Sequence, residues 1–229
     1  MSGGVDSSVA ALLLHNAGYD VIGVTMKLYN VDDQNLPAYY RGCCTVDDVE
    51  DARRVCHNLG LPHYVFDVQR EFQTFVIDYF CTEYQNGRTP HPCIACNDKI
   101  KFNFLLKRAQ TLRANYIATG HYVRIEPSKE GMRLLKGVDA DKDQSYVLYG
   151  MGQEQLRHTL LPIGGFSKSA IRELATEANF CNANKPDSQD ICFIPTGDYR
   201  KFLSQQVATR NGPIVDCQGT IVGEHSGIE

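Results

Sequence analysis

The sequence lacks three features that would each have pointed to a class of protein. Its apolar runs fall well short of the roughly 20 residues that cross a membrane, so a membrane-spanning protein is excluded. It also lacks excess positive charge, since 23 Lys and Arg against 27 Asp and Glu give a net charge of −4. Binding of nucleic acid through bulk charge is therefore excluded, although a local basic face is not. The first residues form a polar turn rather than an apolar leader, so we expect no signal peptide and a cytoplasmic protein.

Cysteine, in contrast, is abundant, with nine residues in the 229 of the chain. An odd number of cysteines in a chain of this size, without an export signal, is typical of a reducing compartment. We therefore expect thiols that serve chemistry, metal binding or packing rather than a framework of disulfides. Cys56, Cys81 and Cys181 are expected to pack, because each falls in or at the end of a predicted helix. No role is assigned to Cys43, Cys44 and Cys217.

The first half of the chain alternates helical and strand patterns with short connections. Apolar periodicity predicts helices over residues 7–17, 46–60, 70–86 and 99–114. Buried apolar runs predict strands over residues 20–28, 62–68 and 116–120. This alternation predicts an α/β fold in which helices cover both faces of a parallel sheet.

After Tyr122 the alternation is lost, and we expect the second half to support the site rather than to continue the sheet. The elements predicted there are a hairpin over 122–137 and helices near 153–157, 167–179 and 198–208. The predicted domains are a nucleotide-binding domain at 1–137, a helical region with a catalytic loop at 138–210, and the start of a β domain at 211–229. A glycine-rich turn that opens a helix usually follows a strand. We therefore expect a first strand before Ser2 and further β structure after Glu229, and poor stability without them.

The stretch "SGGVDSS" at residues 2–8 combines a flexible turn with a helix start. Its two glycines allow the backbone to approach a ligand closely. The amides that follow open a helix near Asp6, and unpaired amides at a helix start bind anions, phosphate above all. The hydroxyls of Ser7 and Ser8 can add donors. Since the patterns GxxxxGK(S/T) and GxGxxG are absent, the stretch predicts a phosphate cradle without the Walker lysine.

Three cysteines lie in loops rather than in helical patterns. Cys93 and Cys96 form a C-x-x-C pair in a loop bounded by prolines, and Cys192 lies in "SQDICFIP". Three interpretations remain open. A zinc site would use the three thiolates with His91 or His121 as the fourth ligand. An iron–sulfur cluster would use the three thiolates and leave one iron open, whereas a sulfur-transfer pair needs one attacking and one resolving thiol.

Five motifs occur in the order typical of one enzyme family. "SGGVDSS" resembles the PP-loop of the ATP pyrophosphatases. "GRTPHPCIACNDKIKF", "ATGHY", "DKDQSYVLYG" and "KPDSQDICFI" resemble motifs of the tRNA-specific 2-thiouridylases, which thiolate the wobble uridine. The resemblance covers essentially the whole chain and implies the PP-loop α/β fold. The ATP contacts that it implies are Ser2, Gly3, Gly4, Val5, Asp6, Ser7, Ser8, Met26 at the adenine, and Gly120.

The resemblance also implies a nucleophile, Cys96, and a persulfide carrier, Cys192. The residues that it implies for tRNA are His91, Pro92 and Cys93 around the target base, His121 close by, and Lys142, Asp143 and Gln144. It implies as partners the tRNAs of the Lys, Glu and Gln type and a protein that donates persulfide or sulfide sulfur. The basic residues of the predicted helix that follows the C-x-x-C pair are further candidates for phosphate contacts. They are Lys99, Lys101, Lys107, Arg108 and Arg113.

The implied reaction needs each of these parts. ATP adenylates the uracil C2 oxygen, and Mg²⁺, with Asp6 as a candidate ligand, offsets the phosphate charge. A persulfide on Cys192 then attacks C2, and Cys96 attacks the sulfur bridge and leaves a Cys96–Cys192 disulfide. Many family members have Asn where this chain has His91, and some have Asp where it has Cys93. A 4Fe–4S cluster held by Cys93, Cys96 and Cys192 is therefore one alternative, and a PP-loop enzyme acting on a small molecule is another. A non-catalytic module that binds zinc or a nucleotide is the third.

Overall fold

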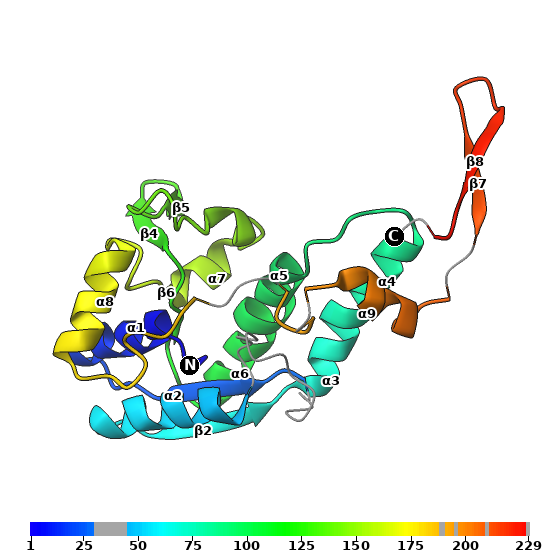
Figure 1. The fold of residues 1–229 in the computed structure, drawn as a ribbon. Coiled ribbons are helices and arrows are strands. Elements are labelled where there is room, and N and C mark those ends of the chain that lie inside the picture. Colours follow the sequence, from blue (N-terminus) through cyan, green and yellow to red (C-terminus); the bar gives the residue numbers. More distant parts are fainter. Residues whose placement is uncertain (30–44, 188–190, 195–196, 209–210, 228–229) are drawn as a thin grey trace.

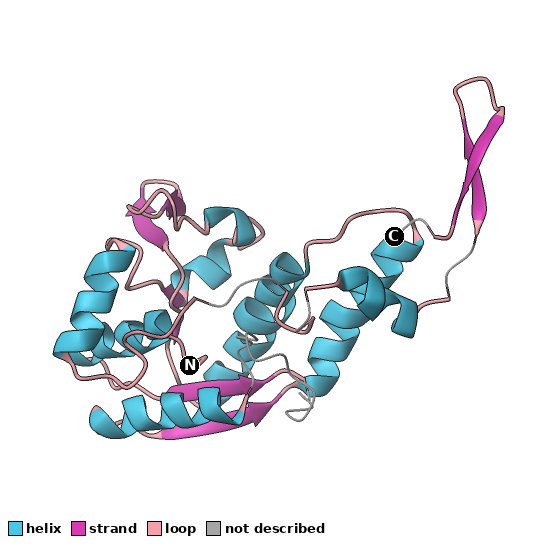
Figure 2. Cartoon of the chain, in the orientation of Figure 1, coloured by secondary structure: helices cyan, strands magenta, loops and turns pink. Residues whose placement is uncertain are grey.

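The computed structural model describes residues 1–29, 45–187, 191–194, 197–208 and 211–227. Helices make up most of its regular structure, and the strands occur in short pairs (Figure 2). The predicted α/β fold with parallel strands is confirmed. Cys43 and Cys44 lie outside the described residues.

The first parallel pair joins β1 (Gly23–Lys27) to β2 (His63–Asp67), with Gly23 opposite His63. The helix between these strands, α2 (Val46–Asn58), lies across the pair (Figure 1). It begins at Thr45, whose hydroxyl accepts a hydrogen bond from the Asp48 amide while the Asp48 carboxylate accepts one from the Thr45 amide. This reciprocal capping satisfies two amides that the helix itself cannot pair.

A second parallel pair joins β3 (Ile117–Ala118) to β6 (Thr159–Leu160). The expectation that the second half only supports the site was wrong here, because β6 lies after Tyr122 and still adds a parallel strand. A strand of two residues shows no alternation of apolar and polar side chains, so its pattern gave no signal. Within the described part of the chain, β1–β2 and β3–β6 are separate pairs rather than one hydrogen-bonded sheet.

The chain between the two parallel pairs of strands forms two long helices. The first is continuous through α3 (Gln69–Phe72), the π-helical turn η2 (Gln73–Ile77) and α4 (Asp78–Gln85). The second is continuous through α5 (Pro92–Ala95), the π-helical segment η3 (Cys96–Phe104) and α6 (Leu105–Thr111). The second helix begins at Pro92, seven residues before the predicted start, because proline is well suited to the first turn of a helix.

The remaining elements agree with the sequence in kind and order. The hairpin predicted over 122–137 is the antiparallel pair β4 and β5, in which Val123 lies opposite Lys136. A second antiparallel pair, β7 and β8, ends the described chain and extends away from the other elements (Figure 1). The bounds are β4 (Val123–Ser128), β5 (Gly131–Lys136), η4 (Ser145–Val147), α7 (Gln153–Arg157), α8 (Lys168–Glu177), α9 (Tyr199–Gln206), β7 (Gly212–Val215) and β8 (Ile221–His225). Before them, α1 (Val5–Asn16) follows the opening loop.

Three clusters of buried side chains hold these elements together. The aromatic cluster joins the first long helix to the chain around α9 and includes Phe72, Phe80, Cys96 and Phe193. A second cluster packs α1 against α8, and a third packs η3 and α6 against β3, β4 and η4. No helix of the described residues is long and apolar enough to cross a membrane.

The cysteines predicted to pack do so in two of three cases. Cys56 is fully buried in α2, and Cys81 packs against the aromatic cluster. Burial raises the pKa of both thiols, so they are inert at neutral pH. The prediction for Cys181 was wrong, because this residue is exposed in the turn after α8 and its thiol faces Asp51 at 3.7 Å.

Candidate functional site

The opening loop, residues 2–8, has the backbone that an anion cradle needs. Gly3 has a φ of +71°, and a Cβ built on it would lie 2.7 Å from the Asp48 Cα. Only glycine fits there, since a side chain would be strained by φ and would collide with α2. Gly4 is the N-cap of α1 in an extended conformation, and no side chain of the described residues caps this helix. The first amides of α1 are therefore not occupied by a cap.

The serine hydroxyls of the same loop hold its shape. Ser7 and Ser8 donate from Oγ to the Gly4 carbonyl at 3.1 and 3.0 Å. The Ser2 amide donates to the Ser7 Oγ at 3.2 Å. The loop is thus organised before any ligand arrives, which lowers the entropy cost of binding one.

Gly120, which the resemblance assigns to ATP, lies directly against the opening loop. A Cβ at this position would be 2.7 Å from the Asp6 carbonyl carbon and 2.8 Å from the Ser7 nitrogen. The backbone that leaves β3 therefore touches the backbone at the start of α1. The structure brings these two predicted ATP contacts together from positions more than 110 residues apart.

Asp6 holds a lysine that the sequence analysis missed. Lys168, the first residue of α8, lies 2.8 Å from each carboxylate oxygen of Asp6. The Tyr122 hydroxyl donates to the same carboxylate at 2.7 Å, and burial, followed by this bond to Asp6, raises the Tyr122 pKa. The cradle lacks a Walker lysine in its own motif, yet a lysine from another helix is present beside it.

Asn182 is a second residue that the motifs did not reveal. Its amide nitrogen donates to the Gly3 carbonyl at 2.8 Å and to the Ser8 Oγ at 2.9 Å. The side chain is 2% exposed, and its Oδ1 has no hydrogen-bond partner among the described residues. Asn182, in the segment after α8, therefore stabilises the opening loop from its buried side.

Asp187, five residues after Asn182, forms ion pairs with three basic side chains. Its carboxylate lies 2.8 Å from Lys142, 2.7 Å from Lys168 and 3.1 Å from Arg172. Burial raises the pKa of Asp187, but the hydrogen bonds from Lys142 and Lys168 outweigh burial and hold the pKa below its ordinary value. Lys142, assigned to tRNA by the resemblance, is thus linked through Asp187 to Lys168 and so to Asp6.

The C-x-x-C pair lies where a loop enters the second long helix. His91 is the N-cap of α5, Pro92 is its buried first residue, and Cys93 is exposed on it. Cys96 begins η3 and is only 8% exposed, because it belongs to the aromatic cluster. The following side chain, Asn97, donates from its amide to the Val147 carbonyl at 3.2 Å and fixes this turn of the helix.

Cys192 packs against the same cluster as Cys96. Met26, which the resemblance assigns to the adenine, also packs there from the end of β1. The structure therefore gathers both candidate sulfur residues and the candidate adenine contact around one set of buried side chains. Two residues that are close in the sequence reach the two regions, since Asn182 bonds to the opening loop and Phe193 lies inside the cluster.

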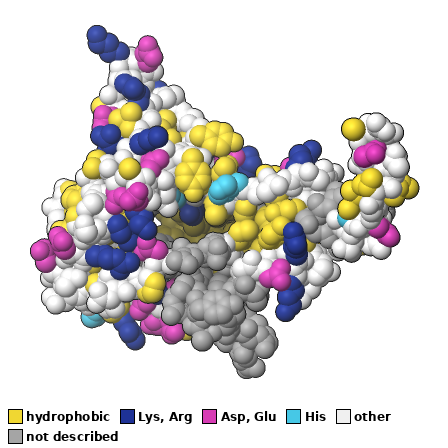
Figure 3. Space-filling model, turned by 45° about the horizontal axis from the view of Figure 1, so that its top comes forward, with side chains coloured by type: hydrophobic (Ala, Val, Ile, Leu, Met, Phe, Trp, Pro, Cys, Tyr) yellow, Lys and Arg dark blue, Asp and Glu magenta, His cyan; other side chains and the backbone are white. Residues whose placement is uncertain are grey.

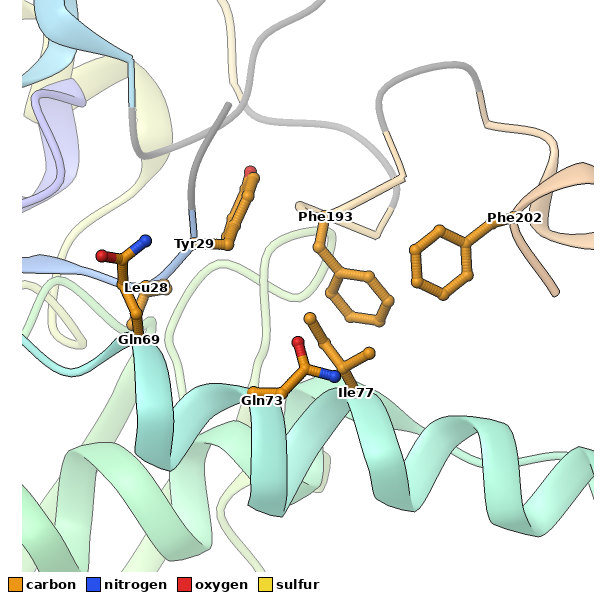
Figure 4. Close-up of a pocket in the computed structure, with 7 residues that line it drawn as sticks. All are labelled: Leu28, Tyr29, Gln69, Gln73, Ile77, Phe193 and Phe202. Carbon is orange, nitrogen blue, oxygen red and sulfur yellow. The ribbon is translucent and has the colours of Figure 1, made fainter. Parts of the chain in front are cut away.

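A cavity of about 330 Å³ opens beside this cluster. Its lining residues are Leu28, Tyr29, Gln69, Gln73, Ile77, Phe193 and Phe202. In Figure 4 the Phe193 ring faces the cavity between Phe202 and the Gln73 side chain. Because Phe193 follows Cys192, the cavity adjoins the predicted persulfide carrier, and nothing in the sequence pattern had indicated it.

The other residues assigned to tRNA have partners within the protein. Gln144 exchanges two hydrogen bonds with the Tyr122 backbone, and Asp143 accepts from the Gly137 amide and the Ser145 hydroxyl. His121 is 8% exposed and lies 2.7 Å from the Thr119 hydroxyl. Burial, with a smaller contribution from the charge of Lys101, holds the His121 pKa well below its ordinary value.

The alternative of a metal cluster finds no support in the ligand geometry. No three His, Cys, Asp or Glu side chains among the described residues are grouped closely enough to hold a metal ion. Cys93, Cys96 and Cys192 accordingly do not form a ready site for zinc or for an iron–sulfur cluster. For Mg²⁺, the acidic group at the cradle is Asp6, whose carboxylate is a suitable hard ligand.

Sequence comparisons place this site among known proteins. Three relatives, each named tRNA-specific 2-thiouridylase MnmA, come from Roseiflexus castenholzii, Clostridium acetobutylicum and Heliobacterium modesticaldum. They are 50%, 51% and 52% identical to this chain and match all of it. The chain spans 66%, 64% and 60% of their respective lengths. A solved structure, of a predicted subunit of tRNA methyltransferase from Methanocaldococcus jannaschii, matches 76% of this chain and 72% of its own. Its TM-score is 0.42 at 18% identity, too low to bear on the fold.

A family model gives the broader assignment. The model described as the tRNA methyl transferase HUP domain matches residues 1–196, which include the opening loop, the C-x-x-C pair, Gly120 and Cys192. The match covers well over half of the chain and agrees with the α/β fold and its parallel strands. The chain therefore belongs to the tRNA methyl transferase HUP domain family.

Proposed function

We propose that this chain is the ATP-binding and sulfur-transferring part of a tRNA-uridine 2-sulfurtransferase. The observations that carry this proposal are the contacts of Asn182 and Cys192, which are ten residues apart in the sequence. Asn182 bonds to the opening loop, and Cys192 packs against the cluster that contains Cys96. Adenylation followed by sulfur transfer requires a nucleotide cradle and two thiols of this kind.

The first step uses the opening loop. The uracil C2 oxygen attacks the α-phosphate of ATP, pyrophosphate leaves, and C2 then carries AMP as its leaving group. The amides at the start of α1 and the Gly120 backbone would line the phosphates, while Met26 would contact the adenine. Asp6 would hold Mg²⁺, whose positive charge would offset the phosphates, in exchange for its ion pair with Lys168.

The second step uses the two thiols. The outer sulfur of a Cys192 persulfide attacks C2 and displaces AMP, which forms a bridge from the Cys192 Sγ through that sulfur to C2. The Cys96 thiolate then attacks the Cys192 Sγ. The bond between this sulfur and the bridging one breaks, and its electron pair stays on the sulfur bound to C2. The products are 2-thiouridine and a Cys96–Cys192 disulfide, which an external thiol must reduce before a sulfur donor protein reloads Cys192.

For the RNA we propose the contacts that the resemblance assigns. His91, Pro92 and Cys93 would border the wobble uridine, since they form the start of the helix that carries Cys96. His121 would lie close by, and Lys142, Asp143 and Gln144 would contact the tRNA. Chemistry at C2 requires the base to leave its stack, and the exposed Cys93 at the start of α5 offers an edge to receive it. We also propose the domain limits 1–137, 138–210 and 211–229.

The decisive experiment is thiolation of unmodified tRNA by the full-length protein with ATP, Mg²⁺, a protein that donates persulfide sulfur and a reducing thiol. We expect Cys96→Ser and Cys192→Ser to abolish 2-thiouridine, detected by mass spectrometry of digested tRNA. Cys181→Ser is the matched control, because this thiol is exposed and faces Asp51 rather than the aromatic cluster, and it should retain full activity. Full activity of Cys96→Ser would refute the proposed transfer.

A second measurement separates the reaction from the chemistry of other enzymes that cleave ATP. Pyrophosphate release should depend on tRNA and persist in Cys192→Ser, because adenylation precedes sulfur transfer. Pyrophosphate release without tRNA, stimulated instead by a small molecule, would contradict RNA as the substrate.

A further inference from the structure

Tyr146 and Tyr149, in the segment after Lys142, are exposed, whereas the residues between them are buried in the core. Tyr146 is 58% exposed and Tyr149 is 73% exposed, whereas Val147 and Leu148 between them are 6% and 2% exposed. Large aromatic rings normally bury most of their area, so two exposed rings that flank buried residues are unusual. Tyr146 in η4 and Tyr149 just after it thus present their rings to the solvent, while the residues between them are buried.

Hydrogen bonds on both sides of the turn η4 fix its backbone. Gln144 is bonded twice to the Tyr122 backbone, and the Val147 carbonyl accepts from the Asn97 amide. Val147 and Leu148 also belong to the third buried cluster, with Phe102 of the helix that carries Cys96. A ring on such a support loses little conformational freedom when it binds a ligand, which favours affinity.

The position of Tyr146 relates it to the candidate reaction centre. Its ring is 5.8 Å from the His91 ring, at an interplanar angle of 66°. His91 is the N-cap of the helix that carries Cys96 five residues later. The Asn97 side chain donates a hydrogen bond to the carbonyl of Val147, the residue that follows Tyr146. On the face shown in Figure 3, a histidine side chain lies among hydrophobic ones at the edge of a hollow. Tyr146 therefore stands beside the loop that the proposed function gives to the target base.

We propose that Tyr146 is a stacking surface for an unpaired nucleotide of the substrate RNA. This inference rests on the proposed function, because it names a contact for that same RNA. A base removed from its stack leaves neighbours that have lost a stacking partner, and an aromatic ring replaces that partner without regard to sequence. Lys142, four residues before Tyr146 in the sequence, is 40% exposed and pairs with Asp187, so a phosphate could meet its ammonium group.

The test uses the full-length protein and an unmodified anticodon stem-loop RNA with 2-aminopurine next to the target uridine. Binding is followed by titration, and stacking by quenching of the 2-aminopurine fluorescence. We expect Tyr146→Ser to weaken RNA binding by about 10-fold or more and to abolish the quenching. Tyr146→Phe should stay within about 2-fold of the unaltered protein, since stacking needs the ring and not the hydroxyl.

Tyr116 provides the matched control. It is 45% exposed, and its ring also lies near a histidine, with the His158 ring 6.5 Å away, but it precedes β3 and is remote in sequence from the turn. Tyr116→Ser should leave the affinity and the quenching unchanged. Thermal unfolding of each variant shows that a loss of binding is not a loss of fold.

Four outcomes would overturn the inference, and they are distinguishable. Unchanged affinity and quenching in Tyr146→Ser, with normal binding by the unaltered protein, would refute the stacking surface alone. A loss of RNA affinity in Tyr146→Phe equal to that in Tyr146→Ser would show that the RNA contacts the tyrosine hydroxyl rather than the ring. A change in self-association with unaltered RNA affinity would make the surface a protein contact. If the unaltered protein bound no RNA, the proposed function would fail together with this inference.

Discussion

The opening loop of residues 2–8 and the aromatic cluster around Cys96 are two regions of the molecule that are stabilised by opposite means. Around the cradle, glycine backbones touch other backbones, and Lys168, Asp187 and Asp6 form a chain of ion pairs. Around Cys96, stabilisation comes from packed rings, with the Phe80 and Phe193 centroids 5.4 Å apart. One region is organised by charge and close approach, and the other by the burial of apolar area.

This difference suits what the proposed function asks each region to bind. A polyphosphate is stabilised by fixed amides and cations, which act best when they need not reorganise on binding. A thiolate that attacks a sulfur bridge is favoured by a site from which competing water is excluded. Asn182 belongs to the polar region and Phe193, eleven residues later, to the apolar one.

The largest expected effect is on the aromatic side. Phe80 is fully buried, and its ring contacts those of Tyr84, Phe193 and Phe202. Phe80→Ala should lower the free energy of unfolding by about 3–5 kcal/mol through lost burial and a residual cavity. Urea unfolding at low and high salt measures this, and the loss should not depend on salt. Phe75→Ala is the control, since this ring is 44% exposed and should cost under about 1 kcal/mol.

On the cradle side the next largest effect should come from Gly3→Ala. The new Cβ would meet the Asp48 backbone and would also occupy a position with φ of +71°, so we expect a loss of about 2–4 kcal/mol. Gly18 has a similar φ of +82° but nothing within 4 Å of an added Cβ, so Gly18→Ala isolates the strain at about 1–2 kcal/mol. Equal losses in the two variants would show that the contact with α2 yields easily.

A smaller effect, specific to the charged region, is expected from Asp187→Asn. The hydrogen bonds from Lys142 and Lys168 outweigh burial and lower the Asp187 pKa in the folded protein. Their stabilisation is therefore present above the ordinary carboxyl pKa of about 4 and is lost as pH falls through the lowered value. At neutral pH we expect a loss of about 1–2 kcal/mol after allowance for partial exposure.

Unfolding free energies measured from pH 6 down to pH 2 distinguish this origin. The difference between the unaltered protein and Asp187→Asn should shrink as the pH falls. A difference that stays constant over this range would mean that packing rather than charge makes the Asp187 contribution.

The smallest effect should come from an ion pair that lies on the surface. Arg53 and Glu50 pair on α2 with side chains 54% and 41% exposed. Arg53→Ala should change the unfolding free energy by less than about 0.5 kcal/mol, and high salt should remove even that. A loss as large as that of Asp187→Asn would erase the distinction between the enclosed ion pairs beside the cradle and ordinary surface pairs.

The sequence predicted those parts of the site that are local in the chain. The turn at Gly3, the helix that follows it and the hairpin over 122–137 each have a pattern within a few residues, and the structure contains all three. Lys168 and Asn182 were missed because each reaches the cradle from a position more than 160 residues away. No periodicity marks a side chain that is placed by the packing of one helix on another, as α8 is placed on α1. The thiols were found through motifs, whereas their shared cluster became visible only in the fold.

The hydrogen bond between Asn97 and the Val147 carbonyl joins the helix that carries Cys96 to the turn that carries Tyr146, since Asn97 follows Cys96 and Val147 follows Tyr146. Under the proposed stacking of RNA on this ring, the same bond would link the position of the bound strand to that of the candidate nucleophile.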